Sequence, residues 1–208
     1  MEPTMEPILA VVTPLVWTLD YYRDAYGVAD PEELALIQLE DMERARRMEI
    51  ALRDLYGLDA DLTRPRNREG PEEEIGTPEE LRALRELAAA AAGFTLADYH
   101  EGRVPPGYLY QHLINHDEAD GYYLPLDFPQ PFWLGDEEEG DEVLSVGSAV
   151  ALRRELEALR PVLAERFPRE MAAVERGSLP PAGPVRVWAA LLRLAGASLE
   201  LDLPIQLG

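Results

Sequence analysis

The segment SAVALRRELEALRPVLAERF, residues 148–167, carries a clear helical pattern. Its large apolar residues recur at steps of three or four, which is typical of a helix with one face in a core. They are Leu152, Leu156, Leu159, Leu163 and Phe167. Ser148 precedes this stripe at the position of an N-cap, and Pro161 predicts a kink or a split within the helix.

Two further helix starts are indicated by a shared pattern. Asp30-Pro31 and Thr77-Pro78 each place a capping oxygen before a proline at the first helical position, with glutamates in the first turn. The first of these helices should end at Gly57. Asp41 interrupts its apolar face, either at a frayed edge or as a buried polar contact. That face comprises Leu34, Ile37, Ala45, Met48, Leu52, Leu55 and Tyr56.

The remaining elements predict a small sheet. Residues 8–19 are apolar, and we expect a buried strand or irregular strip there, leading into a short helix. Residues 121–128 and 199–207 each predict a strand, and because Pro125 and Pro204 lie within them, edge strands or a bulge are favoured. A buried helix over 184–198 precedes the last strand.

The sequence therefore predicts a predominantly α fold with a small β component (α+β), in a single compact domain over residues 1–208. Two loops are expected, a mobile one over about residues 61–76 and an acidic one over about residues 135–142. The apolar run at the start is too short to cross a bilayer and is preceded by acids, so we expect neither a membrane segment nor a signal peptide.

Composition excludes several classes of function. The 208 residues include 40 acids and 19 basic residues, which gives a formal charge of −21 that would repel nucleic acid and anionic membranes. Every basic residue is arginine, so lysine Schiff-base and P-loop chemistry are excluded. Without cysteine there is neither a disulfide nor a thiol nucleophile, and a cytoplasmic location is expected. The arginine bias indicates a GC-rich genome, with a thermophilic source as one option.

The negative charge is concentrated in the middle of the chain. Residues 71–146 carry 18 acids and 3 arginines, whereas residues 147–208 carry 7 acids and 8 arginines. Residues 116–142 alone hold ten acids and no arginine, interleaved with aromatic residues and prolines. Such a segment is suited to a basic protein partner rather than to a nucleic acid.

We therefore expect a cytoplasmic binding protein whose acidic and aromatic segment 116–142 docks on a basic protein. Toxin-neutralising immunity proteins are one class of this kind, because a nuclease's basic cleft calls for concentrated negative charge and aromatic anchors. The alternative is that the rings lie in the core and only the acids are outside. The oligomeric state is left open. The expected interaction residues are Asp117, Tyr122, Tyr123, Phe132, Trp133, Asp136 and Glu138.

The second hypothesis is a metal-dependent, hydrolase-like enzyme that holds one divalent metal ion. The first hypothesis expects no cofactor. His112 and His116 are four residues apart, so on a helix both rings could reach one ion, with Asp120 as a third ligand and His100 as a further candidate. Leu113 stands where a zincin has its general-base glutamate, so metalloprotease chemistry is unsupported. The competing interpretation is a helix end followed by a turn.

The second half of the chain resembles an uncharacterised bacterial protein family. The resemblance begins near Tyr108 and rests on an NHxxxDGYYxPxDF-type motif from Asn115 to Phe128, a VGS-led leucine-rich helix that includes Glu155, and a C-terminal helix with Trp188. No activity is established for that family. The resemblance implies that the motif and the last two helices belong to one structural unit.

Overall fold

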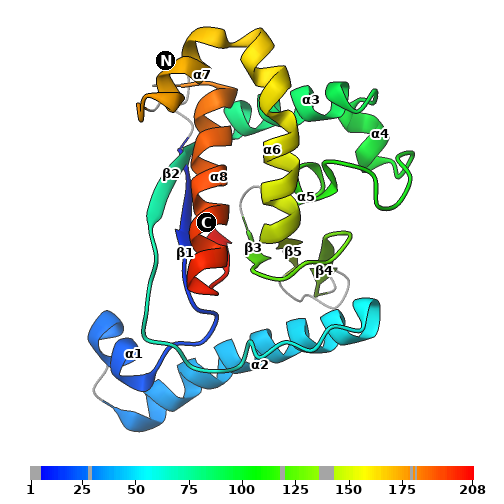
Figure 1. The fold of residues 1–208 in the computed structure, drawn as a ribbon. Helices are drawn as coiled ribbons and strands as arrows, with labels where there is room; N and C mark the ends of the chain where they lie inside the picture. The colour runs from blue at the N-terminus through cyan, green and yellow to red at the C-terminus, as the bar shows by residue number, and fades with distance from the viewer. Residues whose placement is uncertain (1–5, 28–29, 118–119, 136–142, 179, 181) are drawn as a thin grey trace. The chain divides into compact units, whose positions relative to one another are not determined.

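The structure of the protein is a computed structural model, which describes residues 6–27, 30–117, 120–135, 143–178, 180 and 182–208. Within these residues the chain forms eight α-helices and one six-stranded sheet, so the expected α+β class is confirmed (Figure 1). Its contacts divide the chain into two compact units. Unit 1 comprises Met1–Val12 and Gly70–Gly208, and unit 2 comprises Thr13–Glu69. The expectation of a single domain stays a prediction.

The sheet lies in unit 1 and has the strand order β2-β1-β6-β3-β5-β4. Strands β3 and β5 are parallel, and every other neighbouring pair is antiparallel. Residues from both ends of the chain therefore meet at the centre of the sheet. The strands are β1 (Ile8–Val12), β2 (Glu72–Gly76), β3 (Gly121–Leu124), β4 (Phe132–Leu134), β5 (Leu144–Ser148) and β6 (Ile205–Leu207).

Six helices complete unit 1, and the two longest of them run side by side (Figure 1). Helix α8 packs on β1, β2 and β6, and α6 packs on β3 and β5. The expected N-cap is confirmed, since the Ser148 hydroxyl accepts the N–H of Ala151 at 3.0 Å. The six helices are α3 (Pro78–Ala91), α4 (Leu96–His100), α5 (Gln111–Ile114), α6 (Ala149–Arg166), α7 (Pro168–Glu175) and α8 (Pro184–Leu201).

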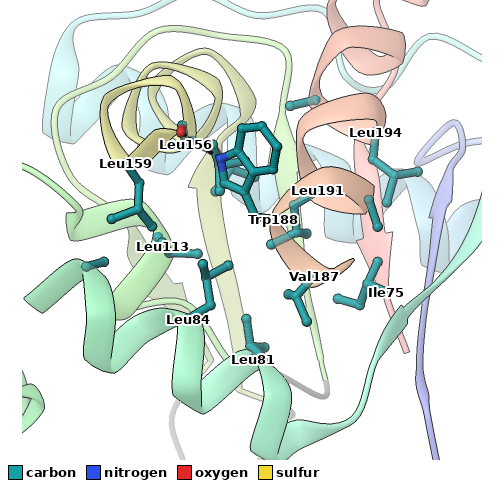
Figure 2. Close-up of a cluster of buried hydrophobic side chains, with 14 of the residues drawn as sticks. Ile75, Leu81, Leu84, Leu113, Leu156, Leu159, Val187, Trp188, Leu191 and Leu194 are labelled. Atoms are coloured by element: carbon teal, nitrogen blue, oxygen red, sulfur yellow. Dashed lines mark hydrogen bonds between the residues drawn. The ribbon is translucent and has the colours of Figure 1, made fainter. Parts of the chain in front are cut away.

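Trp188 lies in the middle of the core of unit 1 and is 1% exposed. Its indole N–H donates to the carbonyl oxygen of Leu156 at 2.7 Å, which joins α8 to α6. Figure 2 shows that α3, α5 and β2 direct apolar side chains into the same cluster. The labelled members besides Trp188 are Ile75, Leu81, Leu84, Leu113, Leu156, Leu159, Val187, Leu191 and Leu194.

Unit 2 contains α1 (Leu19–Tyr26) and α2 (Pro31–Tyr56), which pack on each other. The side chain of Asp30 caps α2 by accepting the N–H of Glu32 at 3.0 Å. Asp41 proves to be a partly buried polar contact, because its carboxylate accepts hydrogen bonds from the Tyr22 hydroxyl and from Arg44. The buried face of α2 is Leu34, Ala45, Met48 and Leu52, whereas Leu55 is exposed.

Several expected boundaries were wrong. Helix α8 continues to Leu201 rather than ending at residue 198, and Asp202 then stops it in the left-handed conformation. Strand β6 is therefore short and central, and Pro204 lies before it, where its missing N–H costs no ladder hydrogen bond. Strand β3 is also internal, because it lies between β6 and β5. It ends at Leu124, so Pro125 lies outside the strand.

Two other expectations need correction. Residues 72–76 of the expected loop form β2, because they pair with β1 in spite of their three consecutive glutamates. Pro161 does not split α6, which runs without interruption from Ala149 to Arg166. Burial of its leucine stripe outweighs the one hydrogen bond that a proline removes.

Among the described residues, no helix is both long and apolar enough to cross a membrane.

Replacing Leu156 with Ala should lower the free energy of unfolding by roughly 2–5 kcal/mol, because the deletion leaves a cavity beside Trp188. Leu9→Ala provides the control, since Leu9 is exposed on β1 and its truncation should cost less than about 1 kcal/mol. Urea unfolding of the wild type and both variants measures these values. Equal losses for the two variants would contradict the assignment of the core.

Candidate functional site

The single-turn helix α5 carries His112 and is held at both ends by buried ionisable side chains. At its N-terminus, the Glu155 carboxyl group of α6 accepts the N–H groups of His112 (3.1 Å) and Leu113 (2.8 Å). At its C-terminus, the Arg85 guanidinium of α3 donates to the carbonyl oxygens of Leu113 (2.9 Å) and His116 (2.5 Å). The carboxyl group lies at the positive end of the helix dipole and the guanidinium at its negative end, and both bind backbone groups that lack a partner within the helix.

Glu155 is the most strongly perturbed carboxyl group of this site. Burial raises the pKa of Glu155 to about 8, although the two backbone N–H groups that it accepts act in the opposite direction. In the folded protein a proton is therefore retained on Glu155 at a pH where an exposed glutamate is ionised.

His112 uses both ring nitrogens in contacts with the backbone. Its Nδ1 accepts the N–H of Ser148 at 2.9 Å, and Nε2 therefore carries the proton and donates to the carbonyl oxygen of Phe128 at 3.0 Å. Burial lowers the pKa of His112 to about 4, so the ring is neutral at pH 7. The side chain thus ties α5 to the end of β5 and to the segment after β3.

His116 is also buried, but each of its ring nitrogens lies against a backbone carbonyl oxygen. Its ring stacks on Tyr123 with centroids 3.9 Å apart. Nδ1 lies 2.8 Å from the carbonyl oxygen of Asp117, Nε2 lies 3.1 Å from that of Tyr122, and the Ser145 hydroxyl is 3.1 Å from Nδ1. Burial lowers the pKa of His116 to about 4 as well.

The residues expected as metal ligands do not meet as a set. His112 and His116 direct their nitrogens to backbone groups, whereas Asp120 and His100 are exposed. In the part of the chain that the structure describes, no three His, Asp or Glu side chains are placed to hold one ion. The geometry therefore favours a positioning role for the two buried histidines, which fix the segment that leads into β3.

The expected interaction residues divide between the interior and the surface. Tyr122, Tyr123 and Phe132 are buried, so these three rings are not part of a docking surface. Tyr123 illustrates the reason, because its ring stacks on His116 and its hydroxyl donates to the carbonyl oxygen of His112 at 3.0 Å. Trp133 behaves differently and is 51% exposed on β4, the outer strand of the sheet.

Trp133 lies on the face of the sheet where Ser145 binds the backbone of Asp117 and Asp120. In the ladder it lies opposite Ser145, so the two side chains point to the same face. The Ser145 hydroxyl accepts the N–H of Asp117 at 3.0 Å and donates to the carbonyl oxygen of Asp120 at 3.1 Å. Asp117 and Asp120 are both exposed. The expected residues Asp136 and Glu138 lie outside the described residues.

Sequence reasoning did not assign a role to Glu155 or Arg85. Each is an ionisable residue on the otherwise apolar, buried face of its helix, beside Leu156 in α6 and beside Leu81 and Leu84 in α3. A charge at such a position is normally paired or hydrogen-bonded when buried. That signal could have identified both residues, but not the backbone groups that they bind.

A methyl group at position 147 should disturb the stack of His116 on Tyr123. A Cβ added to Gly147 would lie 2.6 Å from a ring carbon of Tyr123 and 2.9 Å from one of His116. We expect Gly147→Ala to destabilise the fold by roughly 1–3 kcal/mol. Gly196→Ala in α8 meets nothing within 4 Å and should instead stabilise it by up to about 1 kcal/mol. Thermal unfolding should move in opposite directions for the two variants.

The Glu155→Gln variant should reveal the protonation state of the buried carboxyl. Because its folded pKa of about 8 lies above the ordinary value of 4.5, the protonated form stabilises the wild type at low pH, and this contribution is lost as pH rises through about 8. Glutamine does not titrate. We therefore expect a penalty of roughly 1–3 kcal/mol at about pH 5 that shrinks towards about pH 9. Urea unfolding at several pH values measures it, and a penalty that grows with pH would show that the fold prefers the carboxylate.

Comparison with known proteins adds one finding to this geometry. The chain matches the family described as "putative DNA-mimic protein" over residues 32–207. No curated protein and no solved structure shows significant similarity to it. Since the family match extends over most of both units, the chain belongs to this DNA-mimic family.

Proposed function

We propose that this protein binds a DNA-binding protein at the surface that otherwise holds DNA. Membership of the DNA-mimic family is the observation that carries the proposal. The concentration of 18 acids against 3 arginines in residues 71–146 supports it. The sequence predicts a partner with a basic surface. The proposal adds that this surface of the partner is the one that contacts DNA phosphates.

The physical basis is the replacement of phosphates by carboxylates. Proteins bind duplex DNA largely through Arg and Lys contacts to its phosphates, which release condensed counterions and make affinity fall steeply with salt. A surface of carboxylates offers the same basic residues negative partners without any base sequence to read. A chain with a formal charge of −21 would also steer a basic partner towards itself during diffusion.

The described part of the proposed docking surface is the corner formed by Asp117, Asp120 and Trp133. No described arginine forms an ion pair with Asp120. Trp133 adds an aromatic side chain of the type that anchors protein interfaces. In the segment between β3 and β4, Asp127 is instead paired with Arg154 of α6 at 3.3 Å, so its charge is partly compensated.

The proposal predicts that the protein and duplex DNA compete for the same partner. The immobilised full chain is incubated with a bacterial lysate, and bound proteins are eluted with a non-specific duplex oligonucleotide. We expect the eluted protein to be DNA-binding and, once purified, to bind either labelled duplex or this protein but not both. A partner that binds the two at once would overturn the proposal.

Variants of the exposed corner locate the surface. Asp117→Asn/Asp120→Asn and Trp133→Ala should each weaken binding to that purified partner by about tenfold. Glu165→Gln/Glu170→Gln is the charge-matched control, since it removes two exposed carboxylates from α6 and α7. Affinity of the wild type should also fall steeply with salt. Equal losses for the two charge variants would show that only net charge matters and that this corner is not the docking site.

A further inference from the structure

Helix α2 presents a second face on the side opposite to its buried residues. Leu36, Leu39 and Ile50 are 61%, 49% and 46% exposed. At 100° per residue, all three lie on the side of the helix facing away from Met48 and Leu52. Single exposed apolar residues are ordinary, but three in register along one helix face indicate a contact.

These residues belong to a repeat with the spacing of a coiled-coil seam. Alternating steps of three and four residues join six positions, which are the a and d positions of successive heptads. We call them the α2 seam: Leu36, Leu39, Glu43, Arg46, Ile50 and Arg53. Its two charged central positions are of opposite sign, so the occupant of this face should carry the opposite charges in matching places.

The charge around the α2 seam argues against binding of the basic partner proposed for the corner formed by Asp117, Asp120 and Trp133. Residues 36–53 contain four acids and four arginines and are therefore neutral, in a chain with a formal charge of −21. A neutral stretch does not attract a basic surface that binds DNA. It does allow the approach of a second, equally acidic molecule, because local repulsion is small there.

A second copy of the chain fits the seam when the two helices are antiparallel. With a two-fold axis between residues 44 and 45, Glu43 faces Arg46 of the second copy and Leu39 faces Ile50 of the second copy. Each of these contacts occurs twice by symmetry. A parallel pair would instead place Glu43 opposite its own equivalent, where two carboxylates repel.

The surface of the seam is also hollowed in the required place. A hollow of about 510 Å³ is lined by Glu40, Glu43, Arg44, Arg46, Arg47 and Ile50. Residues 43, 46, 47 and 50 have the spacing of the four residues that receive one knob from a facing helix. The antiparallel arrangement inserts Glu43 of the second copy there, against Arg46 and Arg47. We propose that the protein forms a dimer through the α2 seam, with the two α2 helices antiparallel.

Sedimentation equilibrium of the full chain tests self-association. The wild type should form a dimer, and Ile50→Glu should raise the dimer dissociation constant by about tenfold or more. Leu55→Glu is the matched control, because Leu55 is 58% exposed on the same helix but lies outside the seam. A wild type that stays monomeric at high concentration, or equal effects of the two variants, would overturn the proposal.

Charge exchange tests the pairing independently of apolar burial. Glu43→Arg should weaken the dimer, because the new charge would face Arg46 of the second copy. The double variant E43R/R46E should restore the wild-type dissociation constant to within about threefold, since the pair is re-formed with its signs reversed. A double variant that dimerises no better than E43R would contradict an antiparallel register.

The absence of cysteine from the chain allows a direct test of orientation. In the antiparallel dimer, L39C/I50C should yield a cross-linked dimer under mild oxidation, because residues 39 and 50 of different copies are adjacent. Each single variant should remain uncross-linked. Cross-linking of L39C alone would show a parallel pair and would exclude the proposed arrangement.

Discussion

The attachment of helix α5 between Glu155 and Arg85 is the interaction on which the site depends. A helix of one turn has too few internal hydrogen bonds to persist alone, and its ends leave N–H and C=O groups that cannot remain unpaired in a core. A carboxyl group at one end and a guanidinium at the other satisfy them. Because the two side chains come from α6 and α3, the same contacts fix these helices relative to the segment that leads into β3.

The histidines extend this arrangement towards the sheet. His112 bonds to the backbone at the end of β5, and His116 stacks on Tyr123 and lies against the carbonyl oxygens of Asp117 and Tyr122. The exposed corner at Asp117, Asp120 and Trp133 thus stands on a buried and fully hydrogen-bonded base. A docking surface of fixed shape loses less conformational entropy on binding than a mobile one.

The sequence predicted those features of the fold that local chemistry determines. Caps at Asp30, Thr77 and Ser148 and the leucine stripe of α6 were identified because side-chain type and spacing are visible along the chain. The order of strands was not, since β6 reaches the centre of the sheet only through pairing with β1 and β3. The spacing of His112 and His116 is visible in the sequence, but whether such rings face an ion or the backbone depends on distant residues such as Phe128 and Ser148.

The two outer strands of the sheet also bear on how the molecule behaves in concentrated solution. A free strand edge is a template for pairing with another chain, and proteins blunt it with short strands or with charge. Here β4 has three residues, and β2 carries Glu72, Glu73 and Glu74 in succession. With a sequence pI near 4.4, mild acid removes much of the repulsion that keeps such edges apart. Colloidal stability in this protein is therefore tied to pH through its sheet edges as well as through its net charge.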